Sequence, residues 1–292
     1  MLGHETVARV VEAGPRVRHL RPGDLVPRVG TPPTGGYSVT WGGFAELGIA
    51  TDWRAAQEDG LPADRWGGCR MQRVLPPGTD PAAATMLITW RETLSYANRI
   101  GVAAGKSVLV VGTGGNGLAF VRHAANAGAE PRVMAGSAAR EGAARKAGAK
   151  HFVNHRLPDA REAVSRIRPE GFDLVLDAVG KQGSLDMAVS QLAAGGTLGI
   201  YGLDDLGRCT MNPESARGTF TVFRGGYDEA ETHEQVLGLF QAGKLDASVW
   251  LDLAHPFALD EIGEAIEATR SRKVVKALIR VRGSLPSPSG RG

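Results

Sequence analysis

Hydrophobic and polar residues follow two different patterns along the chain. In residues 5–49, short runs mix apolar and polar positions and are interrupted by Gly and Pro, which is typical of β-strands joined by turns and long loops. Residues 80–105 have apolar positions at helical spacing and end at a glycine. From residue 107 onward, short apolar runs alternate with amphipathic stretches. The pattern predicts a β-rich first segment and a second segment in which strands alternate with helices.

The alternating segment has the pattern of a parallel sheet. Its first strand, Val108–Val111, is wholly apolar, as strands buried on both faces are. Further strands are predicted at 131–136, 151–154, 172–180 and 197–202, with helices ending at Gly128 and spanning 139–149, 159–167 and 183–196. Helices at 233–245 and 259–271 and a strand at 273–281 follow. This order predicts an α/β fold with a right-handed, doubly wound parallel sheet.

The turn after the first apolar strand carries a glycine pattern. Gly112, Gly114 and Gly117 match G-x-G-x-x-G, and Gly115 and Asn116 complete the turn. The first glycine permits a tight turn, the second lets the backbone approach a pyrophosphate, and the third allows close helix packing. Amides at the helix N-terminus then face the negative charge. The motif predicts dinucleotide binding, and the alternative is a glycine turn with a purely structural role.

The end of the second strand bears on which dinucleotide binds. NAD sites usually place Asp or Glu there to hold the ribose 2′-hydroxyl. This chain has no acid at that point; Ser137 follows the strand and Arg140 comes soon after. A hydroxyl and a guanidinium suit a 2′-phosphate, so NADP is favoured over NAD. The alternative for Arg140 is a solvated helix residue.

Composition excludes several other classes of protein. The 292 residues carry a formal net charge of +3, with scattered Lys and Arg, whereas nucleic-acid surfaces usually concentrate basic residues. The two cysteines, Cys69 and Cys209, are too few for a zinc lobe with four cysteines. No apolar run approaches the roughly 20 residues of a membrane span, and no signal pattern is present. We expect a cytoplasmic protein that binds neither nucleic acid nor membrane.

Five segments in this order resemble the medium-chain dehydrogenase/reductase superfamily, which includes zinc-type alcohol and polyol dehydrogenases and zinc-free quinone reductases. The resemblance covers about residues 2–281 and is carried by "LGHETVARVVEAGPRVRHLRPGDLV", "VLVVGTGGNG", "FDLVLDAVG", "GGTLGIYG" and "KVVKALIRV". It implies a GroES-like catalytic domain formed by residues 1–85 and a return segment, 220–281. Residues 86–219 would form a Rossmann NAD(P)-binding domain, and 282–292 are predicted to be a disordered tail.

The resemblance also assigns residues to the cofactor. It implies that the backbone around two segments lines the nicotinamide, with the candidate residues Ala178, Val179, Gly180, Tyr201 and Gly202. Lys276 matches a basic position that commonly touches the pyrophosphate, and the alternative for it is an exposed lysine at a strand end. The family implies a small-molecule substrate and a homodimer.

Zinc-type relatives use the histidine of a "GHE" motif as a ligand of catalytic zinc, and this motif matches His4 and Glu5. The family's first ligand, a Cys, lies upstream of that motif, so the catalytic domain is expected to be incomplete at its N-terminus. The third ligand position is occupied by Ile88, which cannot bind zinc. Glu92, one helical turn later, is a candidate substitute ligand or acid/base, and the alternative is a surface glutamate paired with Arg91 or Arg99.

Three functions are compatible with these residues. The first is a zinc-type, NADP-dependent oxidoreductase acting on an alcohol or polyol, with His4 and Glu5 at the metal and Glu92 as a further catalytic candidate. The second is a zinc-free NADPH reductase of quinones or enones, which is favoured by Ile88 because this side chain cannot bind zinc. The third is a catalytically impaired dinucleotide-binding protein. Zinc is therefore an open question at this point, whereas a nicotinamide cofactor, NADP or NAD, is common to all three.

Overall fold

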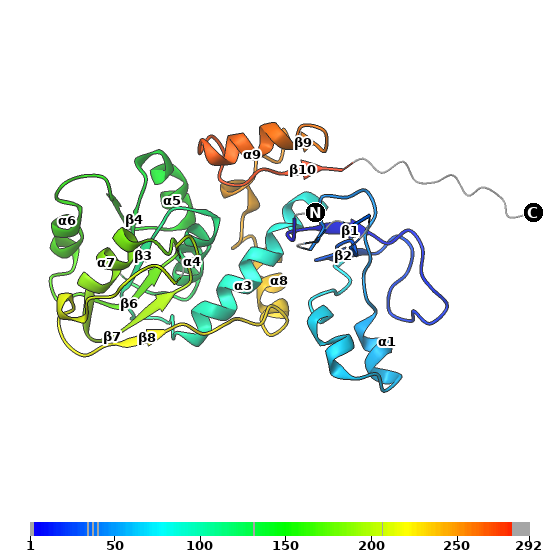
Figure 1. Ribbon diagram of the computed structural model, residues 1–292, viewed down its shortest axis with the longest axis horizontal. Coiled ribbons are helices and arrows are strands. Elements are labelled where there is room, and N and C mark those ends of the chain that lie inside the picture. The colour runs from blue at the N-terminus through cyan, green and yellow to red at the C-terminus, as the bar shows by residue number, and fades with distance from the viewer. Residues whose placement is uncertain are drawn as a thin grey trace, which may run out of the picture. The chain divides into compact units, whose positions relative to one another are not determined.

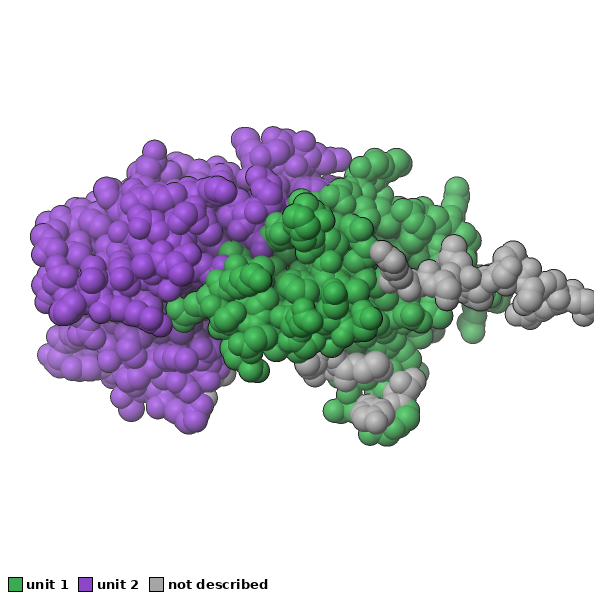
Figure 2. Space-filling model, turned by 90° about the horizontal axis from the view of Figure 1, so that it is seen from above, with its two compact units in different colours: residues 1–88, 251–292 green, residues 89–250 purple. Residues whose placement is uncertain are grey.

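The computed structural model describes residues 3–33, 35–36, 38–39, 41–130, 132–205 and 207–281. The predicted tail at 282–292 lies outside the described residues. The chain forms two compact units: unit 1 comprises Met1–Ile88 and Leu251–Gly292, and unit 2 comprises Thr89–Trp250 (Figure 2). Residues 220–250 of the expected return segment 220–281 thus group with residues 89–219 instead, because residues 226–232 are hydrogen-bonded to helix α3 (Met86–Arg99).

Unit 2 contains one sheet of six parallel strands in the order β5-β4-β3-β6-β7-β8 (Figure 1). The chain starts in the middle of the sheet, builds outward to one edge, and then returns to build the other half. This is the doubly wound order of a Rossmann fold. The strands are β3 (Val108–Val111), β4 (Arg132–Gly136), β5 (His151–Asn154), β6 (Phe172–Asp177), β7 (Leu192–Ile200) and β8 (Thr221–Phe223).

Helices cover both faces of this sheet. Leu109 and Val111 of β3 belong to a buried cluster with residues of the helices α6 and α7, whereas Val108 and Val110 point to the opposite face. Both faces are therefore buried, which explains the wholly apolar strands. The helices of unit 2 are α4 (Gly115–Asn126), α5 (Glu141–Ala147), α6 (Ala160–Ile167), α7 (Gln182–Ser190), α8 (His233–Gln241) and most of α3 (Met86–Arg99).

Two elements of unit 2 differ from the sequence prediction. The helix expected at 183–196 ends at Ser190, and strand β7 begins at Leu192, because the backbone of Phe172 pairs with Leu192 at the edge of β6. The strand Thr221–Phe223 was not predicted; it is short and half-exposed, so it lacks the apolar run that marks its neighbours. Edge strands of this kind leave a weak hydrophobic signal.

The described residues of unit 1 form two separate ladders of two strands each. Strand β1 (Val7–Arg9) pairs antiparallel with β2 (Leu25–Pro27), and β10 (Ile279–Arg280) pairs in parallel with β9 (Phe257–Ala258). The strand expected at 273–281 is thus reduced to two residues, since β9 offers only two partners. The helices of unit 1 are α1 (Trp53–Glu58), α2 (Pro81–Ala84), α9 (Ile262–Arg270) and the start of α3. Among the described residues, no helix is both long and apolar enough to cross a membrane.

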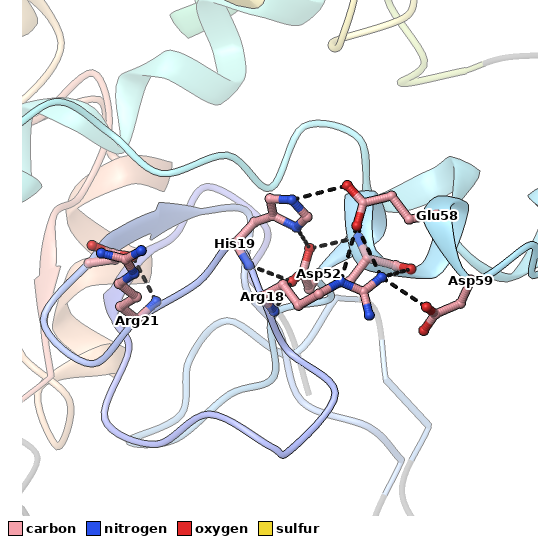
Figure 3. A network of polar contacts seen from close by, with 8 residues as sticks. Arg18, His19, Arg21, Asp52, Glu58 and Asp59 are labelled. Carbon is pink, nitrogen blue, oxygen red and sulfur yellow. Dashed lines mark hydrogen bonds and ion pairs between the residues drawn. The ribbon is translucent and has the colours of Figure 1, made fainter.

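Helix α1 lies between the β-rich first segment and the helix predicted from residue 80, in a stretch for which the sequence predicted no element, and Figure 3 shows the polar network that holds it. The side chain of Asp52 caps the helix by accepting the N–H of Ala55 at 3.0 Å. It also accepts the backbone N–H groups of Arg18 and His19 at 2.7 and 2.8 Å. The imidazole of His19 lies between Asp52 and Glu58 at 3.0 and 3.2 Å. An Asp directly before a short helical stretch was the signal that could have predicted α1.

Candidate functional site

Two glycines of the fingerprint are required because neighbouring atoms approach them closely. Gly112, directly after β3, has a φ of +113°, and a Cβ there would lie 2.7 Å from Val179 Cγ2. A Cβ on Gly117 would lie 2.1 Å from the carbonyl oxygen of Gly112. Any side chain at either position would displace the turn or the first turn of α4.

Gly114 is different, because a Cβ there would meet nothing within 4 Å. It is the N-cap of α4, and no side chain hydrogen-bonds to the helix from that position. An uncapped helix start with open space before it presents backbone N–H groups to an anion. Gly115 and Asn116 form the first helical positions, and the indole of Trp250 donates a hydrogen bond to the carbonyl oxygen of Gly115 at 2.8 Å. The turn therefore has the form of a phosphate cradle.

The loops after β6 and β7 lie against each other. A Cβ on Gly180, whose φ is +82°, would be 2.4 Å from the carbonyl carbon of Gly202. Asp177 joins the two loops: its carbonyl oxygen accepts the N–H groups of Tyr201 and Gly202 at 3.0 and 2.9 Å. Its carboxylate accepts those of Val179 and Gly180 at 2.9 and 3.1 Å. Burial raises the pKa of this carboxyl against the effect of these donors.

The structure thus brings the predicted nicotinamide-lining segments together and beside the fingerprint. The N–H of Ala178 donates to the carbonyl oxygen of Val111 at 2.9 Å, so the loop after β6 is tied to the end of β3. The ring of Tyr201 packs edge-on against Tyr96 and Phe120, with centroids 5.1 and 5.0 Å away. These contacts fix the loop containing Tyr201 and Gly202 relative to α3 and α4.

Ser137 and Arg140 lie together at the end of β4. The N–H of Arg140 donates to the carbonyl oxygen of Ser137 at 2.9 Å, in the 3-10 helix η3 (Ala138–Arg140). Their exposed fractions are 8 and 9%, so Arg140 is not the solvated helix residue of the alternative interpretation. Arg145, further along, pairs with Glu141 at 3.1 Å instead. The segment from Gly136 to Arg140 therefore contains a hydroxyl and a guanidinium side chain and no carboxylate.

Glu92 is buried, with 4% of its surface exposed, which excludes the interpretation as a surface glutamate. Both arginines suggested as its partners form contacts with other residues. Arg91, fully buried, donates to Glu229 and His233 at 3.1 Å each. Arg99 forms an ion pair with Glu231 at 2.9 Å. Sequence reasoning missed the cluster of Arg91, Glu229 and His233, because Arg91 lies 138 and 142 residues from the other two and shares no motif with them.

His4, Glu5 and Lys276 form a second group, in unit 1. Lys276 Nζ lies 2.5 Å from Glu5 Oε1, although the two residues are 271 positions apart. Lys276 is therefore not the exposed strand-end lysine of the alternative interpretation. Burial lowers the pKa of His4, and Lys276 contributes in the same direction. All three residues line a cavity of about 930 Å³ within unit 1.

The described residues do not fit a zinc site. Catalytic zinc needs three protein ligands. No group of three or more His, Cys, Asp or Glu side chains among these residues is placed to hold a metal. His4 and Glu5 supply at most two donors, Glu5 is already paired with Lys276, and the buried Ile88 carries no ligand atom. This part of the chain therefore lacks the ligand set that catalytic zinc requires.

Known proteins resemble the chain over nearly its whole length. The family model described as zinc-binding dehydrogenase matches residues 115–239. A probable zinc-binding alcohol dehydrogenase of Mycobacterium tuberculosis is 28% identical over 93% of this chain and 71% of its own length. L-galactonate-5-dehydrogenase of Escherichia coli is 26% identical over 96% of this chain and 82% of its own length.

Solved structures share the fold. Alcohol dehydrogenase TADH from Thermus sp. ATN1 matches with a TM-score of 0.77 and 24% identity, over 96% of this chain and 86% of that one. A putative zinc-binding dehydrogenase from Sinorhizobium meliloti, solved bound to NADP, matches with a TM-score of 0.65 and 22% identity, over 91% of this chain and 79% of that one. Together with the doubly wound sheet and its glycine turn, these matches confirm the resemblance and the α/β fold. The chain is thus similar, over nearly its whole length, to the alcohol dehydrogenase-like oxidoreductases of the medium-chain dehydrogenase/reductase superfamily.

Proposed function

We propose that this protein binds NADP in preference to NAD and transfers hydride between the nicotinamide and a small alcohol or polyol or its carbonyl product. The observation that carries the proposal is the phosphate cradle. A Cβ on Gly112 would collide with the side chain of Val179 and one on Gly117 with the backbone of Gly112, whereas Gly114 faces open space at an uncapped helix start. A structural glycine turn would have no need for that open position.

The residues present fit a dinucleotide. The first amides of α4, at Gly115 and Asn116, would face the pyrophosphate, as helix N-termini do for anions. The backbone of residues 178–180 and 201–202 would line the nicotinamide and exclude water from it. The cofactor, when bound, supplies the hydride. The chain's own contribution is to orient the ring with these loops, which Asp177 holds in register.

The preference for NADP is supported by the end of β4. Gly136 stands where NAD sites usually carry an acid, and Ser137 and Arg140 are the polar groups next to it. A guanidinium pairs strongly with a phosphate, while a carboxylate at this point would repel one. The relative from Sinorhizobium meliloti, which was solved with NADP, is consistent with this assignment.

A second candidate function is a zinc-free NADPH reductase of quinones or enones. The lack of a three-ligand group among the described residues favours it, and so does the ion pair that occupies Glu5. The named relatives favour the alcohol function instead. Metal analysis of the purified protein separates the two: about one zinc per chain supports the alcohol enzyme, and none supports the reductase. A catalytically impaired protein would bind NADPH and turn over neither class of substrate.

The cofactor assignment is tested by titrating the protein with NADPH and NADH. Trp250 is a built-in reporter because its indole is bonded to Gly115 and packs edge-on against Trp90 at 5.7 Å. We expect NADPH to quench tryptophan fluorescence and raise the melting temperature more than NADH does. Arg140→Gln should weaken NADPH binding about tenfold, since a charge-assisted contact to a phosphate contributes roughly 1.5 kcal/mol.

The matched control is Arg161→Gln, which changes an exposed arginine on α6 and should leave both affinities unchanged. Equal or reversed responses to the two dinucleotides would contradict the assignment to NADP. Binding of neither would contradict the proposed function as a whole. The expected homodimer is a separate proposal, tested by light scattering during gel filtration.

A further inference from the structure

Thr113 lies inside the glycine fingerprint, yet its side chain belongs to the other end of the predicted cofactor site. Strands β3 and β4 are parallel, with Val111 opposite Ala135, so position 113 falls beside position 137. The N–H of Ser137 donates to Thr113 Oγ1 at 3.2 Å. Thr113 is buried together with Ser137. The second residue of the fingerprint therefore holds the turn that follows β4.

The same side chain controls which residue can end β4. A Cβ on Gly136 would lie 2.0 Å from Thr113 Cγ2, 2.7 Å from Oγ1 and 2.9 Å from Cβ. Rotating the threonine about χ1 moves the first two atoms but not its Cβ. A branched side chain also has few alternative rotamers. While threonine occupies position 113, only glycine fits at 136.

We infer that Thr113 is a specificity-positioning residue for the 2′ substituent of the cofactor's ribose. Its methyl group excludes any acidic side chain at the end of β4, which is the group that NAD sites use for the 2′-hydroxyl. Its hydroxyl holds the backbone of Ser137, and with it the turn that carries Arg140, in place for a 2′-phosphate. The inference rests on the proposed function, because it assigns a determinant within the same site.

Two single substitutions separate the roles of the hydroxyl and the methyl. Thr113→Val keeps the branched shape but leaves the N–H of Ser137 unpaired, whereas Thr113→Ser keeps the acceptor. The probes are NADP, NAD and adenosine 2′,5′-bisphosphate, which contains the 2′-phosphate without the nicotinamide half. Thr113→Val should weaken the binding of NADP and of the bisphosphate on the order of fivefold, which corresponds to the loss of one hydrogen bond. The affinity for NAD should change by less than about twofold. Thr113→Ser should match the wild type. Equal losses for NADP and NAD, or no loss, would overturn the inference.

A double substitution tests the exclusion of acids. Gly136→Asp alone should lower the melting temperature by several degrees, because the new Cβ collides with Thr113. Combining it with Thr113→Gly should restore the melting temperature and shift the preference at least tenfold toward NAD. A stable Gly136→Asp single variant would show that Thr113 excludes nothing. The melting measurement needs no cofactor, so it tests the contact between residues 113 and 136 independently of cofactor binding. If the wild type binds neither dinucleotide, the proposed function is refuted instead.

Discussion

The two units assemble their candidate residues in different ways. In unit 2 the cofactor candidates follow the ends of neighbouring parallel strands, so the sheet itself brings the glycine turn, Ser137 and the loop at 178–180 together. In unit 1, His4 and Glu5 meet Lys276 only because segments 271 residues apart pack around one cavity. A site built on a regular sheet can be read from short motifs, whereas a site built from loops and short ladders depends on the whole unit.

Removing one partner of a charged pair is expected to show the largest difference in stability between the two units. Arg91 and Glu229 in unit 2 have side chains that are 0 and 2% exposed, so Arg91→Met leaves a buried carboxylate without its arginine. We expect a loss of about 4 kcal/mol in the free energy of unfolding, measured by urea denaturation. The pair of Lys276 and Glu5 in unit 1 is 20 and 26% exposed, and Lys276→Met should cost no more than about 1 kcal/mol. Similar losses in the two variants would remove the distinction between the units.

A smaller effect is expected from the glycines of the fingerprint. Gly117→Ala places a Cβ 2.1 Å from a backbone oxygen that cannot move away freely, and it should destabilise the protein by about 2–3 kcal/mol. Gly142→Ala is the matched control, since that helical glycine has nothing within 4 Å and alanine favours a helix. Thermal melting of both variants checks this. A tolerated Gly117→Ala would mean that helix α4 can shift and that the motif does not fix the turn.

These contrasts explain which features the sequence could predict. The apolar run Val108–Val111 and the glycine turn predicted a buried parallel strand and a helix start, because both are properties of neighbouring residues. The end of α7 was placed too late, since pairing with β6 draws Leu192 into a strand despite helix-favouring alanines. The ion pair between Glu5 and Lys276 left no local signal at all. Tertiary contacts decided each of these last two features.

The smallest effect concerns pH and Asp52 in unit 1. Burial acts to raise the pKa of Asp52, but three backbone N–H donors and the imidazole of His19 outweigh it and lower the pKa to about 2. A folded-state pKa below the ordinary value of 3.8 means that this carboxylate stabilises the fold above about pH 4. That contribution disappears as the pH falls toward 2. We therefore expect acid to loosen α1 and the loop of Arg18 and His19, which Asp52 connects.

The measurement is hydrogen exchange of the amides in α1 and at residues 18 and 19 between pH 2 and 5, corrected for the intrinsic pH dependence. Asp52→Asn keeps an oxygen acceptor for the helix cap but loses the charge, so its protection should be lower than that of the wild type at pH 5 and nearly equal at pH 2. Asp252 is the control, because it also bonds a nearby histidine but is exposed, and Asp252→Asn should change nothing in α1. If the wild type and Asp52→Asn lose protection in parallel across this range, the charge of Asp52 contributes nothing to the stability of α1 and of the loop at residues 18 and 19.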